Sequence, residues 1–200
     1  MPTAPSTLRA SHPTGPAHGR TASLPLILGF DPGLQHTGYG VLRSGGGRPE
    51  ILEAGMLSTR HGPDLGVRLC QLHRDVENLL RETRPDLVVL EDLFTHARFP
   101  RTAIVLGHVR GVICLAAASA GVEVLALAPS VVKRAVTGSG RASKPQVQAA
   151  LCGLLGVRNL TNSHAADALA LAYAGLARIR PAFGGPHRSA AHGSGAAARR

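Results

Sequence analysis

The chain has 200 residues, enough for one ordinary globular domain with its own hydrophobic core. Its formal charge of +10 comes from 22 Lys and Arg against 12 Asp and Glu. This excess favours a polyanionic partner such as nucleic acid, although a basic surface also serves solubility. The longest tempting apolar run, residues 111–122, is uncharged over twelve positions, whereas a bilayer needs about 20 residues. No signal-like segment opens the chain, so we expect a cytoplasmic protein without a membrane span.

The two ends of the chain differ in composition from its middle. Residues 1–24 and 181–200 are rich in Pro, Gly, Ser and Ala, and they contain arginines but no Asp or Glu. Such segments bury too little apolar surface to offset the entropy lost on ordering. We therefore expect two disordered basic tails around one domain at 25–180.

The first part of the domain is expected to consist mainly of short strands. The apolar run LPLILGFD, which ends at Asp31, is typical of a buried strand, and the turn DPG follows it. Strands at 38–43 and 50–58 complete a three-stranded meander. Apolar residues recur at helical spacing over 64–83, and DLVVLE then forms another buried strand that ends at Glu91.

The remainder of the domain alternates between helices and one more strand. We expect helices at 101–120, 129–136, 144–155 and 163–178, a strand at 122–128 and a flexible stretch TGSGRAS at 137–143. Three consecutive strands followed by alternating strands and helices indicate an α/β fold. The prediction is a five-stranded mixed sheet with helices on both faces.

The three cysteines are far apart and form no CxxC pair. Cys70, Cys114 and Cys152 each occur in an apolar, helical context. We expect them to pack in the core of a protein from a reducing compartment, without metal-binding or catalytic roles.

Two carboxylates and a helical motif carry the candidate chemistry. Asp31 and Glu91 end buried strands, and the carboxyl ends of strands in α/β sheets are where ligands bind. In the last helix, His164 and Asp167 are three residues apart and share one helical face, with small alanines that leave space around them. Each signal is weak alone, because Asp31 could form a turn and His164 could cap the helix.

Three carboxylates and an imidazole in one cleft favour a bound cation, which would relieve their mutual repulsion. Oxygen-rich ligands with one imidazole suit Mg²⁺ or Mn²⁺ better than structural Zn²⁺. Two such ions could hold the attacking water and the leaving oxygen of a phosphoryl displacement.

Four segments in this order resemble the RuvC family of Holliday junction resolvases: LGFDPGLQHTGYGV, LEDLF, VKRAVTGSGRASKPQVQ and SHAADALALA. The resemblance covers about 26–178 and implies an RNase H-like fold. It also implies a crossover junction endodeoxyribonuclease that resolves four-way junctions in recombination and repair. The family's acidic ligands fall on Asp31, Glu91 and Asp167, and a position that is Asp or His among members is His164 here.

The resemblance also implies DNA contacts and partners. An aromatic wedge that stacks on bases at the junction centre falls on Phe94, whose other reading is a loop residue packed in the core. Phosphate-contacting lysines fall on Lys133 and Lys144, the two lysines of the chain, which could otherwise be solvated helix surface. The partners that the resemblance implies are four-way junction DNA and the RuvA–RuvB branch-migration complex.

We also expect a homodimer, because a four-way junction has two-fold symmetry and its paired cleavage requires two equivalent active sites. The helix at 101–120 carries Gly107 and Gly111, whose spacing of four residues would allow a second helix to approach closely. This helix is the candidate interface, although it could instead only cover the sheet.

Three other classes remain open from the residues alone. An actin-like or sugar-kinase-like phosphotransferase shares the first turn but needs a second domain. Another RNase H-like nuclease acting on RNA or an RNA–DNA hybrid would use the same four side chains. A non-catalytic DNA-binding module would not need the three carboxylates, because acids facing phosphate weaken binding.

Overall fold

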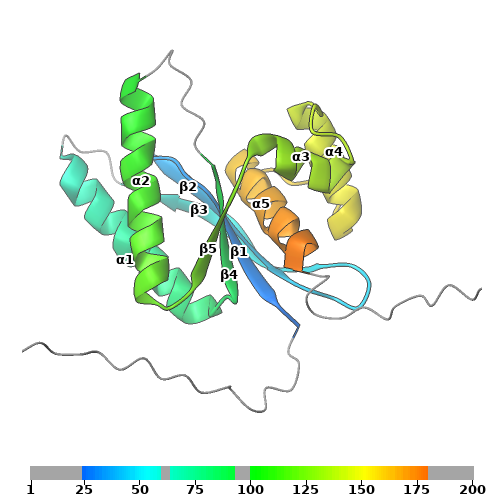
Figure 1. The fold of residues 1–200 in the computed structure, drawn as a ribbon, viewed down its shortest axis with the longest axis horizontal. Helices are drawn as coiled ribbons and strands as arrows, with labels where there is room; N and C mark the ends of the chain where they lie inside the picture. Colours follow the sequence, from blue (N-terminus) through cyan, green and yellow to red (C-terminus); the bar gives the residue numbers. More distant parts are fainter. Residues whose placement is uncertain (1–23, 60–63, 93–99, 180–200) are drawn as a thin grey trace, which may run out of the picture.

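A five-stranded sheet with the strand order β3-β2-β1-β4-β5 forms the centre of the fold (Figure 1). The computed structural model describes residues 24–59, 64–92 and 100–179. Strands β1 (Leu26–Asp31), β2 (His36–Arg43) and β3 (Glu50–Ser58) form the expected antiparallel meander. Strands β4 (Leu87–Glu91) and β5 (Glu123–Leu127) continue the sheet parallel to β1, so the predicted mixed sheet is confirmed.

Helices cover both faces of this sheet, as the sequence predicted (Figure 1). The helices of one layer are α1 (Leu65–Thr83) and α2 (Pro100–Ser119), and those of the other are α3 (Pro129–Thr137), α4 (Lys144–Leu155) and α5 (Ser163–Ile179). Side chains of β1 alternate between the layers: Leu28 and Phe30 pack with α1 and α2, whereas Ile27 packs with α3, α4 and α5. Most of the two basic tails lies outside the described residues, so the domain limits stay a prediction.

Local sequence signals account for the helix boundaries. Asp64 begins α1 by accepting hydrogen bonds from the backbone N–H groups of Gly66 and Val67. At the start of α4, the Ser143 backbone N–H donates to Gln146 Oε1 at 2.8 Å, which is one half of a capping box. Gly156, at φ 71°, ends α4 in the left-handed conformation that glycine adopts without strain.

The apolar stretch of helix α2 is longer than the run of twelve uncharged residues at 111–122 indicated. By length and composition alone, Arg101–Ser119 could cross a membrane, with a mean hydropathy of 1.6. One such helix is weak evidence for a membrane span, because helices of soluble proteins pass the same test. In this fold α2 lies against the sheet through Val109 and Ile113, which are fully buried.

The expectation of core cysteines is wrong for Cys70, whereas Cys114 packs against the edge of an apolar cluster. Cys70 is exposed, and Cys114 and Cys152 are only partly buried. All three are free thiols. Apolar neighbours at helical spacing predicted the helices correctly, but the cysteines lie at the edges of the buried faces.

Helix α5 lies unusually close to the sheet because glycines face it. A Cβ atom added to Gly29 of β1 would lie 2.1 Å from the Ala168 carbonyl oxygen, and one added to Gly38 of β2 would lie 2.1 Å from the His164 carbonyl oxygen. The alanines of α5 were expected to leave space around His164 and Asp167, and a cavity does lie beside Asp167 and Ala170. Ala168 is fully buried, and the alanines let the helix backbone approach the strands.

Replacing Gly29 with Ala should lower the free energy of unfolding by about 1–3 kcal/mol, as overpacking of a close-packed core does. The new methyl group would meet the Ala168 oxygen at 2.1 Å and the Ala172 nitrogen at 2.7 Å, and both are backbone atoms that cannot rotate away. Urea denaturation followed by circular dichroism measures the change. The matched control is Gly153→Ala in α4, where the added carbon has open space and should stabilise by about 0.5–1 kcal/mol. Equal effects of the two substitutions would contradict the close packing of α5.

Candidate active site

Asp31 and Glu91 lie together at one edge of the sheet. They are the last residues of β1 and β4, which are adjacent and parallel, so their strand ends meet at the same edge. Both line a cavity of about 260 Å³. Asp167, Lys133 and Lys144 contribute to the same cavity wall. The structure thus brings together three of the four side chains expected at the metal site and both expected phosphate contacts.

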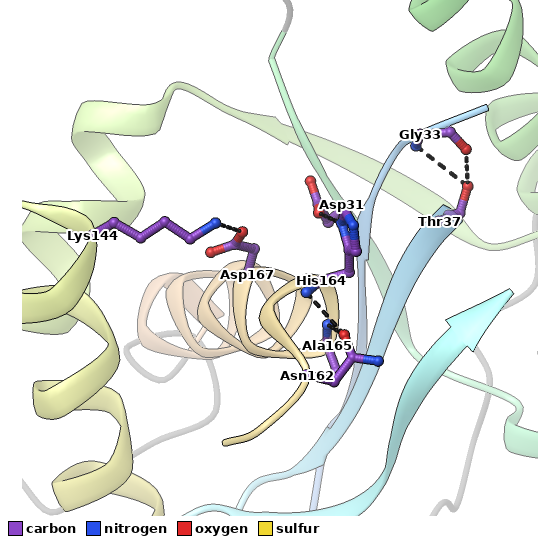
Figure 2. A network of polar contacts seen from close by, with 8 residues as sticks. All are labelled: Asp31, Gly33, Thr37, Lys144, Asn162, His164, Ala165 and Asp167. Carbon is purple, nitrogen blue, oxygen red and sulfur yellow. Dashed lines mark hydrogen bonds and ion pairs between the residues drawn. The ribbon is translucent and has the colours of Figure 1, made fainter. Parts of the chain in front are cut away.

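Asn162 determines where α5 begins, and the sequence reasoning missed its role. Its Oδ1 atom accepts hydrogen bonds from the backbone N–H groups of His164 at 3.0 Å and Ala165 at 3.1 Å (Figure 2). The segment TNSHAAD carries the signal, because Asn before an apolar helix is a preferred N-cap. Capping at this position places His164 and Asp167 in the first turns, next to the ends of β1 and β4.

His164 does not itself line the cavity, but it contacts Asp31, which does. Its Nδ1 atom lies 2.9 Å from Asp31 Oδ2, and the two side chains are 42% and 21% exposed. A neutral imidazole that donates through Nδ1 keeps its lone pair on Nε2, the atom free to bind a cation. The ring of His36 lies 6.0 Å from that of His164, centroid to centroid, so a second histidine stands beside the site.

Lys144 reaches across from α4 to the carboxylate of Asp167 (Figure 2). Its Nζ atom lies 2.5 Å from Asp167 Oδ2, and the Lys144 side chain is 65% exposed. The hydrogen bond to Asp167 raises the pKa of Lys144. An ammonium group therefore balances one carboxylate of the cavity in this structure.

The loop after Asp31 is held by its own turn. The Thr37 hydroxyl donates to the Gly33 carbonyl oxygen at 2.7 Å, and Thr37 is almost fully buried. This contact closes the loop that connects β1 to β2. The end of β1, and with it the backbone of Asp31, is thereby anchored.

Burial destabilises the charged forms of Asp31 and Glu91. Burial raises the pKa of Asp31, and the charge of Asp167 adds to this, while the hydrogen bond with His164 opposes it. Burial also raises the pKa of Glu91, with further increases from the charges of Asp31 and Asp167. Two carboxylates at strand ends and a third on α5 lie close enough to repel one another, and such a group suits a cation.

The donor set fits a hard divalent cation, although the side chains now face protein partners. Among the described residues, no three Asp, Glu, His or Cys side chains are grouped closely enough to hold one ion as they stand. One oxygen of Asp31 contacts His164, and one oxygen of Asp167 binds Lys144. Carboxylate oxygens with one imidazole nitrogen nearby are the ligand types that suit Mg²⁺ or Mn²⁺.

Two further residues bear on the site. Phe94, expected as a wedge in the DNA, lies outside the described residues, so its role stays a prediction. Arg110 of α2 was missed by the sequence reasoning, and its guanidinium Nη1 donates to the backbone carbonyl oxygen of Glu91.

Sequence comparisons identify close relatives over most of the chain. The family model of crossover junction endodeoxyribonuclease RuvC matches residues 27–174. The curated RuvC of Rhodopirellula baltica is 44% identical over 157 residues, which is 78% of this chain and 88% of that protein. The RuvC of Syntrophomonas wolfei is 41% identical over 77% of this chain and 90% of that protein.

Comparison with solved structures also identifies RuvC proteins as similar to this chain. Thermus thermophilus RuvC superposes with a TM-score of 0.73 and 33% identity, covering 79% of this chain and 97% of that one. The complex of that RuvC with a Holliday junction substrate has a TM-score of 0.71 at 30% identity, with the same coverage. The yeast mitochondrial Holliday junction resolvase, at 10% identity and a TM-score of 0.57, shares the fold. This chain therefore belongs to the RuvC family of crossover junction endodeoxyribonucleases.

Proposed function

We propose that this endonuclease cuts four-way DNA junctions at the cavity formed by Asp31, Glu91 and Asp167. The convergence of these carboxylates, from two strand ends and one helix, carries the proposal. The T. thermophilus RuvC with 30% identity was solved with a Holliday junction substrate, which supports the same substrate here. No observation favours the alternative of an RNA or RNA–DNA hybrid substrate.

The chemistry of this family depends on divalent metal, and we propose two Mg²⁺ or Mn²⁺ ions per active site. Asp31, Glu91 and Asp167 would hold them, with His164 as the nitrogen donor. When bound, such ions lower the pKa of a coordinated water and stabilise charge on the phosphate oxygens. The protein contributes the carboxylate positions: α5 fixes Asp167, and the ends of β1 and β4 fix the other two.

Lys133 and Lys144 would contact the DNA backbone beside the carboxylates. Both side chains line the cavity, and as compact point charges they suit phosphate oxygens. Phe94 follows Glu91 by three residues, and we propose it as the aromatic that stacks on bases at the junction centre. Cooperation with a RuvA–RuvB complex and a cytoplasmic location, where the enzyme would reach chromosomal DNA, are also part of the proposal.

A homodimer through α2 is supported by an exposed apolar stripe on that helix. Ile104 is 60% and Leu115 59% exposed, and their spacing of eleven residues places them on one helical face with Gly107 and Gly111. Both glycines have open space around them, so a second helix could approach closely. Only 22% of the apolar stretch 101–119 is buried within the chain, which leaves this face to a partner.

Leu115→Glu should therefore convert the dimer to a monomer. A carboxylate placed on each copy of a symmetric interface would be buried without a partner, and we expect dimer affinity to fall by more than about tenfold, which is 1.4 kcal/mol. Analytical ultracentrifugation over a concentration series measures this. Leu52→Glu is the matched control, because Leu52 is also an exposed leucine, at 37%, but lies on β3. A variant with unchanged dimer affinity would rule out this face of α2.

Asp31→Asn, Glu91→Gln and Asp167→Asn should each reduce junction cutting by about 10³-fold or more. Each removes a charge that would hold the cation, and metal ions supply several kcal/mol to phosphoryl transfer. Junction affinity should be kept, because it rests on the cationic surface. Single-turnover cleavage and gel-shift binding are measured side by side, with Asp92→Asn as the neighbouring carboxylate control. Normal nicking by the Asp167 variant would refute the assignment.

His164 should set the preference between metals. An imidazole donor suits transition metals, whereas Mg²⁺ strongly prefers oxygen, so Mn²⁺ should support cleavage at least as well as Mg²⁺. His164→Asp should retain activity and shift the preference toward Mg²⁺, whereas His164→Ala should lose most activity. The measurement is the ratio of cleavage rates in the two metals for each protein. A ratio unchanged by His164→Asp would leave His164 with no metal contact, acting only through Asp31.

A further inference from the structure

Arg110 is an isolated charge in an apolar helix. It is the one Lys or Arg between residues 102 and 119 of α2, and its side chain is only 18% exposed. Withdrawing a guanidinium from water costs several kcal/mol unless hydrogen bonds replace the lost hydration. The Arg110 guanidinium therefore requires hydrogen-bond acceptors on the strands that α2 faces.

The partners lie at the end of β4, in the active site. Arg110 Nη1 donates to the backbone carbonyl oxygen of Glu91, and Nη2 lies 3.9 Å from Asp92 Oδ1. The second contact is long, and Asp92 is half exposed, so it contributes little. The charge-assisted bond to the Glu91 carbonyl is the stronger interaction.

The two ends of this contact belong to well-anchored elements. Val109 and Ile113, on either side of Arg110, are fully buried in the same apolar cluster as Leu90, the residue before Glu91. On the other side of the strand, the backbone N–H of Asp92 donates to the Leu127 carbonyl oxygen of β5 at 2.8 Å. The peptide that follows Glu91 is thus held from both directions, by α2 and by β5.

We propose that Arg110 is a positioning residue for Glu91. By binding the Glu91 carbonyl oxygen, it fixes the backbone at the strand end and so directs the carboxylate toward Asp31 and Asp167. This role rests on the proposed function, in which Glu91 holds the metal. Arg110 itself touches neither DNA nor metal. Its effect on the metal passes through the Glu91 carboxylate, although the contact itself is with the Glu91 backbone and remains when that side chain is replaced.

The test compares Arg110→Met with Arg110→Lys. Arg110→Met removes both donors while keeping an apolar side chain of similar length, and we expect the affinity for Mn²⁺ and the single-turnover rate each to fall by about 10–100-fold. Junction affinity should stay within about twofold, because the DNA-facing lysines are untouched. Arg110→Lys keeps one donor and should recover part of both losses. Mn²⁺ affinity is measured by calorimetry on the metal-free protein.

Matched controls separate positioning from general stability. Arg81→Met removes an arginine of α1 that hydrogen-bonds Asn78 of its own helix, and it should leave rate and Mn²⁺ affinity unchanged. A merely structural role of Arg110 would lower the melting temperature and the amplitude of cleavage, with an unchanged rate constant in the folded fraction. That outcome would overturn the proposal, as would Arg110→Met with normal Mn²⁺ affinity.

A double variant distinguishes this proposal from the assignment of the site. If Arg110 acts through Glu91, adding Arg110→Met to Glu91→Gln should not weaken Mn²⁺ binding beyond the effect of Glu91→Gln alone. Additive losses would show an action elsewhere and overturn the positioning role. Full activity of Glu91→Gln would instead overturn the proposed function itself.

Discussion

The arrangement of the active site depends on backbone contact between α5 and the sheet. Gly29 and Gly38 leave no room for a side chain between β1, β2 and the carbonyl oxygens of α5. Helices usually pack on sheets through layers of side chains, and that greater separation would hold the first turn of α5 away from the ends of β1 and β4. Here glycine on the strands and alanine on the helix remove that layer. Asp167 of α5 can therefore share one cavity with Asp31 and Glu91.

This close approach has an electrostatic cost. It brings three carboxylates into a partly buried space where burial and mutual repulsion raise the pKa values of Asp31 and Glu91. Lys144 and His164 partly offset the cost by pairing with Asp167 and Asp31. A cation entering the cavity would compete with these pairs for the same oxygens. Its entry would also free Lys144 to face a phosphate group, so one lysine can serve the metal-free and DNA-bound states in turn.

The sequence was most informative where chemistry coincides with a periodic pattern. Asp31 and Glu91 could be placed at one sheet edge because each ends a buried run, and parallel strands end together. Contacts between residues far apart in the sequence leave no periodic pattern from which they could be predicted. Lys144 meets Asp167 across 23 residues, and Arg110 bonds a backbone carbonyl, which any residue at 91 would offer. Cys70 was predicted to be buried but is exposed, because helical spacing indicates which face of a helix is apolar but not how far burial extends along that face.

The two helical layers hold the two strand ends by different means. On one face, the cap at Asn162 positions His164, which contacts the side chain of Asp31. On the other face, α2 holds the backbone of Glu91 through Arg110. The same α2 carries the apolar stripe proposed for the dimer, on the side away from Val109 and Ile113. One helix thus uses its buried side to anchor the end of β4 and keeps its exposed side free of any role in the active site.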